Sequence, residues 1–119
     1  MNGIDFFEKD CVDVINEVTG IEHELYRCYR NGMTKTSTNV RHYDTHHKGD
    51  RTLLFYGHQH WENIWGGETA FGENDEIFVK PVPNSAVYFS AKHWLHHGRA
   101  FAANANELRI TYVWKLMRI

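Results

Sequence analysis

The chain has 119 residues and a formal net charge of −2, and hydrophobic and charged residues make up 42% and 24% of it. This length predicts one domain with a single core, and the composition is that of a folded globular protein rather than a disordered or collagen-like chain. The longest apolar runs are a few residues, so we expect neither a membrane span nor a secretory signal. The charge balance does not indicate nucleic-acid binding. Nine histidines favour a metal site.

The first twenty residues have the period of an amphipathic helix. Apolar side chains recur there at three- and four-residue steps, at Ile4, Phe7, Cys11, Val14, Ile15 and Val18. Gly20 is suited to end this helix, because glycine readily adopts the left-handed conformation found after helix C-termini. The two cysteines, Cys11 and Cys28, form no CxxC pair. They predict reduced thiols of a cytoplasmic protein, with a Cys11–Cys28 disulfide as the alternative.

After residue 20 the pattern changes to short strands. We expect them at Glu24–Arg30, Asn39–Tyr43, Thr52–Tyr56, Glu76–Val79, Ala86–Ser90 and Glu107–Met117. Turn-forming residues separate them, including Asn31-Gly32 and Gly66-Gly67. No second helix is expected. One supporting helix (1–20) followed by many short strands (24–117) predicts a single, mainly β domain over 1–119. Its fold would be a sandwich or jelly-roll barrel with the helix packed on one sheet.

The last predicted strand alternates between two faces. One set should pack against the helix: Leu108, Ile110, Tyr112, Trp114 and Leu116. The other set should face the barrel interior: Arg109, Thr111, Val113 and Lys115. A buried guanidinium needs an anionic partner, and no acidic residue of the chain is an obvious candidate. We therefore expect Arg109 to bind a ligand anion, with help from the Thr111 hydroxyl, unless Arg109 lies on the surface at a strand end.

His42-Tyr43-Asp44 is an H-x-D tripeptide. On a strand, residues two apart point to the same side, so His42 and Asp44 can converge on one metal ion. The third ligand would come from a histidine-rich segment about fifty residues later, where His93, His96 and His97 are the candidates. Two histidines and one carboxylate form the facial triad of non-haem Fe(II) oxygenases, which leaves coordination positions open.

These motifs resemble those of the Fe(II)/2-oxoglutarate-dependent dioxygenases, and more closely the prolyl-4-hydroxylase-like branch found in bacteria and marine phages. The resemblance covers about three-quarters of the chain. Its pieces, in order, are Arg27–Tyr29, His42–Asp44, Leu53–Tyr56, Trp61, Trp65–Thr69, Leu95–Arg99 and Leu108–Tyr112. It implies a double-stranded β-helix that holds iron near one mouth.

The resemblance also implies roles for individual residues. His42, Asp44 and His96 would be the iron ligands, with His97 as second choice for the distal histidine. Arg109 would pair with the distal carboxylate of 2-oxoglutarate, Tyr56 and Thr111 would help to bind it, and Tyr29 would lie beside it. Iron, 2-oxoglutarate and O2 would hydroxylate a C–H bond, with release of succinate and CO2 and with ascorbate in support.

Other residues have weaker assignments. His46, Arg51, His58 and Arg99 are candidate substrate contacts, although His46, His47, Lys48 and Arg51 fit a solvated loop better. Glu68, after the two glycines, is not expected to be a ligand, because the triad is already complete. His23 is expected on the surface, and the four tryptophans are expected in the core.

Two other functions stay open at this point. A cupin-like metal protein, such as an isomerase or a small-ligand binder, would use the same barrel without 2-oxoglutarate, but would leave Arg109 and Thr111 without a purpose. A degenerate, non-catalytic interaction protein would be expected to have lost one of the three metal-ligating residues. The substrate would be a peptide, a protein or a small molecule, in the cytoplasm (of a host, if the protein is phage-encoded). A single helix would leave apolar barrel surface exposed, and we expect a second copy of the chain to cover it in a homodimer.

Overall fold

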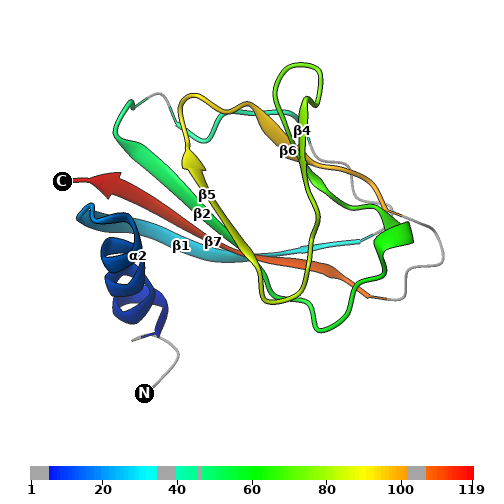
Figure 1. The fold of residues 1–119 in the computed structure, drawn as a ribbon, viewed down its shortest axis with the longest axis horizontal. Helices are drawn as coiled ribbons and strands as arrows, with labels where there is room; N and C mark the ends of the chain where they lie inside the picture. Colours follow the sequence, from blue (N-terminus) through cyan, green and yellow to red (C-terminus); the bar gives the residue numbers. More distant parts are fainter. Residues whose placement is uncertain (1–5, 35–39, 46, 102–106) are drawn as a thin grey trace.

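The computed structural model describes residues 6–34, 40–45, 47–101 and 107–119, and these form one helical segment and two antiparallel sheets (Figure 1). The chain begins with a π-helical turn, η1 (Phe6–Asp10), that runs into helix α2 (Cys11–Thr19). Gly20 ends α2 with φ +69°, and its N–H donates to the Asn16 carbonyl at 2.9 Å. The predicted helix and its stop are therefore confirmed within the described residues. None of the described helices is long and apolar enough to cross a membrane.

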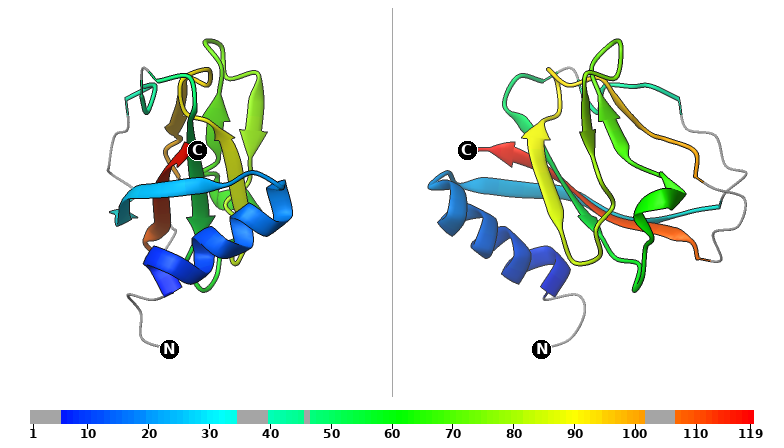
Figure 2. Two further views of the ribbon diagram at one scale, coloured as in Figure 1. Left: turned by 90° about the vertical axis from the view of Figure 1, so that its left-hand side faces the viewer. Right: turned by 45° about the vertical axis from the view of Figure 1, so that its right-hand side comes forward.

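In the described part of the chain, seven strands follow the helix. They are β1 (His23–Met33), β2 (Asp50–Tyr56), β3 (Thr69–Phe71), β4 (Ile77–Val79), β5 (Ala86–Ser90), β6 (His96–Gly98) and β7 (Arg109–Arg118), with a short 3-10 turn, η2 (Asn63–Trp65), before β3. The larger sheet has the order β1-β7-β2-β5 and the smaller one β4-β3-β6. Figure 2 shows the two sheets as separate layers of the same body. This is the expected jelly-roll arrangement, although the two ladders do not close into one continuous barrel.

The larger sheet separates two apolar clusters, because side chains alternate across its strands. On its outer face α2 contributes Val12, packed with Leu53, Trp114 and Leu116. On its inner face Leu54, Tyr56, Phe71, Phe89 and Val113 form the core between the sheets. The inward set of β7 is the one that the sequence predicts, and Arg109, Thr111 and Lys115 are buried. Of the predicted outward set, Tyr112, Trp114 and Leu116 join the cluster beside the helix. Leu108 instead precedes β7 and is 49% exposed.

Both cysteines are free and half-buried beside α2 and the outer face of the sheet. Burial and the neighbouring Cys28 raise the pKa of the Cys11 thiol to about 11. Both groups are therefore poor nucleophiles, because only the thiolate reacts readily.

Three sequence-based expectations about the strands are wrong. Asn31-Gly32 is not a turn, because β1 continues through both residues, which pair with Thr111 and Ile110 of β7. The long partner strand overrides a local turn preference. The strand expected at 39–43 does not form in its described part, residues 40–43, where only His42 makes an isolated β-bridge, with His96. Asn39 lies outside the described residues. The three-residue strands β3 and β6 were not predicted, because such segments are too short to show a period.

His23 is also not on the surface as expected, since it is only 5% exposed. Its Nδ1 donates to the Asn16 amide oxygen (2.9 Å), and its Nε2 accepts from the Tyr88 hydroxyl (2.6 Å). His23 thereby joins α2 to β5.

This burial predicts a pH-dependent stability. Burial lowers the pKa of His23 in the folded protein, so below about pH 6.5 the unfolded chain takes up a proton more readily than the folded one. The free energy of unfolding should therefore fall as the pH drops from 7.5 to 5.5. Denaturant titrations at the two pH values should show that His23→Gln loses less free energy of unfolding between them than the unsubstituted chain does. An equal loss in both would contradict a role for His23.

Candidate metal centre

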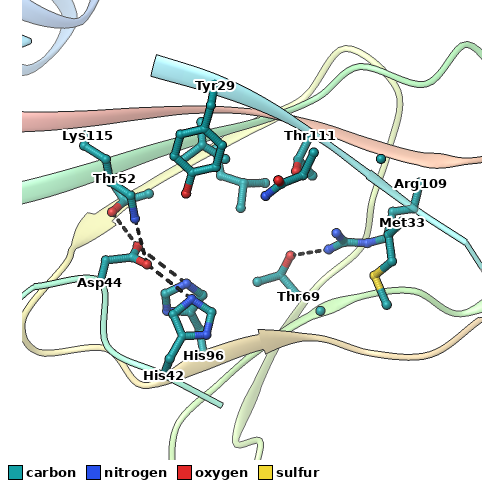
Figure 3. A pocket seen from close by; sticks show the side chains of 15 residues that line it. Tyr29, Met33, His42, Asp44, Thr52, Thr69, His96, Arg109, Thr111 and Lys115 are labelled. Atoms are coloured by element: carbon teal, nitrogen blue, oxygen red, sulfur yellow. Dashed lines mark hydrogen bonds and ion pairs between the residues drawn. The ribbon is translucent and has the colours of Figure 1, made fainter. Parts of the chain in front are cut away.

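A cavity of about 310 Å3 lies between the two sheets. Figure 3 shows its lining: β1 supplies Tyr29 and Met33, β7 supplies Arg109, Thr111 and Lys115, and the opposite side carries His42, Asp44, Thr69 and His96. The cavity has a cluster of metal-ligand types at one end and a buried guanidinium at the other.

The metal-ligand cluster consists of His42, Asp44 and His96. One potential ligand atom from each residue lies within 4.8 Å of the others. His42 Nε2 is 3.3 Å from Asp44 Oδ1, and His96 Nε2 is 3.5 Å from Asp44 Oδ2. The backbone brings the segments together, because the N–H groups of His42 and His96 each donate to the other's carbonyl at 2.9 and 3.0 Å.

The two imidazole rings are held with Nε2 toward Asp44. His42 Nδ1 is 2.7 Å from the Val40 carbonyl, and His96 Nδ1 is 3.1 Å from the Trp94 carbonyl. A carbonyl can only accept, so each Nδ1 carries a proton, and Nε2 is the ring nitrogen that would bind a metal once it is unprotonated. Hydrogen bonding with Asp44 raises the pKa of His42, so a metal ion at this position would compete with a proton on Nε2. Two such nitrogens and one carboxylate fit a divalent first-row metal with open coordination positions, as in non-haem Fe(II) oxygenases.

The electrostatics also suit a metal ion. Burial opposes ionisation of Asp44, but hydrogen bonding with His42, the charge of His96 and bonds from Lys115 and Thr52 together hold the pKa of Asp44 well below its usual range. Burial lowers the pKa of His96. A carboxylate and a neutral imidazole are the protonation states that bind metals.

The structure brings only one of the three candidate distal histidines to this cluster. His96 is 5% exposed and faces the cavity from β6. His97 is instead 3.0 Å from Asp75 Oδ1, because adjacent residues of a strand point to opposite faces. His93 is exposed, and its Nδ1 lies 2.7 Å from the Ser90 hydroxyl. The family resemblance favours His96, with His97 as second choice, and among the three the structure places only His96 beside Asp44.

Arg109 lies at the other end of the cavity and is 5% exposed. Its Nε donates to the Gly67 carbonyl (2.7 Å), and its Nη2 donates to Thr69 Oγ1 (2.8 Å). Within the described part of the chain it forms no ion pair with a carboxylate, so its charge has only neutral partners. A buried guanidinium in this state is a site for an anion.

Two glycines allow this arrangement. Gly67 has φ +77°, and a Cβ there would come within 2.8 Å of the Trp61 ring. A Cβ at Gly98 would lie 3.3 Å from the guanidinium carbon of Arg109. The Gly66-Gly67 turn was expected to be structural, and it also presents a carbonyl to Arg109.

Thr69 is a site residue that the sequence analysis missed, because β3 itself was not predicted. Its hydroxyl accepts from Arg109 and lies 2.6 Å from the hydroxyl of Tyr56. Tyr56 is fully buried behind Thr69 and does not line the cavity. It therefore supports Arg109 through Thr69 rather than facing a ligand.

This network predicts coupled effects on stability. Thr69→Val should lower the free energy of unfolding by about 1–3 kcal/mol, because it leaves the buried Tyr56 hydroxyl without its partner. In a Tyr56→Phe background the same substitution should cost less, since that hydroxyl is already gone. Denaturant unfolding of the two single variants and the double variant measures the difference. Strictly additive losses would contradict the coupling.

Some of the remaining predicted site residues line the cavity and others do not. Tyr29 and Thr111 line the cavity. Three of the four candidate substrate contacts do not line it. Arg51 lies on β2 and donates to the carbonyls of Lys48 and Asp50, His58 is buried against the Pro81 carbonyl, and Arg99 lies over the Phe78 ring. The fourth, His46, lies outside the described residues.

Lys115 is the second residue that the sequence analysis did not assign. It was expected to face inward, but no partner was foreseen. Its Nζ lies 2.7 Å from Asp44 Oδ1, and its side chain is 9% exposed. Figure 3 shows Lys115 and Thr52 on one side of Asp44, with His42 and His96 on the other.

Comparisons with known proteins identify the family and the fold of this chain. A family model described as the 2OG-Fe(II) oxygenase superfamily matches residues 26–114. The fold is similar to the crystal structure of a Pseudomonas putida prolyl-4-hydroxylase, with a TM-score of 0.64 and 20% sequence identity. The alignment covers 92% of this chain but 60% of that chain, so this chain spans less than two-thirds of its neighbour's length. No curated protein sequence matches significantly.

Proposed function

This chain belongs to the 2OG-Fe(II) oxygenase superfamily, and from that premise we propose that it is an Fe(II)- and 2-oxoglutarate-dependent dioxygenase. One observation carries the proposal: a single cavity holds a two-histidine, one-carboxylate cluster and, at its other end, a buried arginine with only neutral partners. The two ends suit the two ends of 2-oxoglutarate, which chelates a metal through its 2-oxo acid group and has a second carboxylate.

His42, Asp44 and His96 would hold Fe(II), which with bound 2-oxoglutarate supplies the oxidation of a C–H bond by O2 and yields succinate and CO2. Arg109 would bind the distal carboxylate in a charge-assisted hydrogen bond, and Thr69 and the Gly67 carbonyl hold its guanidinium in place. Thr111 lies two residues along the same inward face of β7 and offers a further hydroxyl donor. Tyr29 would border the cosubstrate from β1.

The alternative of a cupin-like metal protein has less support. It explains the metal cluster but gives no reason to bury an arginine away from any carboxylate of the described chain, at a considerable desolvation cost. A dicarboxylate cosubstrate explains both ends of the cavity.

For the substrate we propose a prolyl residue of a peptide or a similar small side chain. The similarity of fold to a prolyl-4-hydroxylase supports this. The Tyr29 side of the cavity and the exposed edge of His42 are the sides from which the substrate would approach.

The test is turnover of 2-oxoglutarate by the purified chain. With Fe(II), ascorbate and 2-oxoglutarate it should release succinate slowly even without an added substrate. Asp44→Ala, which removes the carboxylate ligand, should abolish this release. A peptide screen by mass spectrometry then tests the substrate, with a mass increase of one oxygen atom on proline as the expected result. No binding of 2-oxoglutarate and no succinate would refute the dioxygenase.

A further inference from the structure

Lys115 places a positive charge directly against the proposed metal ligands. Its Nζ forms an ion pair with Asp44 Oδ1 at 2.7 Å, and the two side chains are 9% and 5% exposed. Asp44 Oδ2, in turn, accepts from the Thr52 hydroxyl at 2.7 Å. Each oxygen of the carboxylate thus has its own donor, one charged and one neutral.

The neutral donor lies on a well-anchored strand. Thr52 is 1% exposed and lies within β2, where it pairs with Phe89 and Lys115 in the neighbouring strands. Thr52 and Lys115 can both orient the carboxylate, but only Lys115 adds a positive charge to it.

That charge has opposite effects on the binding of the two groups that the cavity is proposed to hold. A buried cation next to Asp44 repels a divalent metal ion and competes for the same carboxylate oxygen. The same cation attracts a dianion that enters the cavity, which Lys115 lines. With Arg109 at the far end, the inward face of β7 carries two positive charges, and the described lining has only one carboxylate, Asp44, between them.

We propose that Lys115 is an electrostatic positioning residue that weakens the binding of the metal ion alone and strengthens the binding of 2-oxoglutarate to the metal-loaded site. The role toward 2-oxoglutarate rests on the proposed function, whereas the role toward the metal rests only on the ion pair with Asp44. The ammonium also lies 5.9 Å from the centroid of the Tyr29 ring.

The test is equilibrium binding of Mn(II), which does not oxidise in air, to the full chain, followed by binding of 2-oxoglutarate to the Mn(II)-loaded protein. Lys115→Met removes the charge and keeps an unbranched side chain of similar length. We expect it to bind Mn(II) roughly tenfold more tightly and then to bind 2-oxoglutarate roughly tenfold more weakly, because the Coulomb interaction with each is lost. Lys115→Arg keeps the charge and should remain close to the unsubstituted chain in both measurements.

Thr52→Val is the matched control, since it removes the neutral donor from the same carboxylate. It should weaken Mn(II) binding, as the loss of a hydrogen bond to a metal ligand usually does, so its effect is opposite in sign to that of Lys115→Met. Thermal unfolding of each variant verifies that it is folded. If Lys115→Met weakens Mn(II) binding as Thr52→Val does, or leaves it unchanged, the proposal is overturned.

The experiment can refute the dioxygenase and the role of Lys115 independently of each other. If the unsubstituted chain binds Mn(II) but not 2-oxoglutarate, the dioxygenase is refuted, while the Mn(II) affinities of the variants still decide the effect of Lys115 on the metal. If the unsubstituted chain binds both and Lys115→Met behaves like it, only the role of Lys115 is refuted.

Discussion

Replacing His96 by alanine should reduce the affinity for Fe(II) or Mn(II) by at least about a hundredfold and abolish succinate release. His96 is buried, faces Asp44 through Nε2, and is held by the Trp94 carbonyl. Loss of a group that merely supports a ligand costs roughly 10- to 100-fold in metal affinity, so loss of the ligand itself should cost at least the upper end of that range. Calorimetry with Mn(II) and a succinate assay measure the two effects.

His97→Ala is the control, because it removes the same type of side chain from the adjacent residue. His97 lies 3.0 Å from Asp75, on the other face of β6. Asp75 also binds Arg41, the neighbour of His42, at 2.8 Å, so some loss of stability is expected. The affinity for metal should stay within about threefold, since partly exposed ion pairs contribute little. Loss of metal binding in His97→Ala with retention in His96→Ala would reverse the assignment.

Replacing Arg109 by methionine should weaken 2-oxoglutarate binding to the metal-loaded protein on the order of a hundredfold. The reason is that a charge-assisted hydrogen bond is roughly twice as strong as a neutral one, and that its loss leaves the distal carboxylate buried without a partner. Metal binding should change far less, because Arg109 contacts Gly67 and Thr69 rather than the metal ligands. Titration of the Mn(II)-loaded protein with 2-oxoglutarate measures this.

A 2-oxo acid without the second carboxylate, such as 2-oxopentanoate, shows whether the charge pair is the cause. It should bind the unsubstituted chain much more weakly than 2-oxoglutarate does. Arg109→Met should bind the two acids with similar affinity, because the group that distinguishes them is gone. If the variant still prefers 2-oxoglutarate by the same factor, the distal carboxylate is bound elsewhere.

Much of this site can be predicted from local patterns. The alternation along β7 assigns Arg109, Thr111 and Lys115 to the interior, and the structure agrees, because a strand packed on a helix must turn its apolar side chains toward it. The H-x-D spacing brings His42 and Asp44 together even though no strand forms around them; the His42–His96 bridge does so instead. The proposed roles of these residues stay predictions until the binding experiments are done, as do the cytoplasmic location and the homodimer.

Other features depend on contacts between distant segments. The local sequence predicts His23 on the surface, because nothing near it shows that the hydroxyl of Tyr88, 65 positions away, donates a hydrogen bond to its ring. The local sequence indicates no role for Thr69, since a three-residue strand has no readable period. The family resemblance implies that Tyr56 helps to bind 2-oxoglutarate, whereas the structure places its hydroxyl behind Thr69.

The fold class, the single helix with its stop at Gly20, and the types of residue that make the metal cluster and the anion site can be predicted from the sequence. These predictions follow from periodicity and from side-chain chemistry, which are properties of the chain near each residue. The pairing of distant strands places His96, rather than His93 or His97, beside Asp44 and pairs Lys115 with Asp44. It also leaves Arg109 with only neutral partners among the described residues. Those outcomes depend on which strands pair and in what register, because a shift of one residue turns every side chain to the opposite face of the sheet.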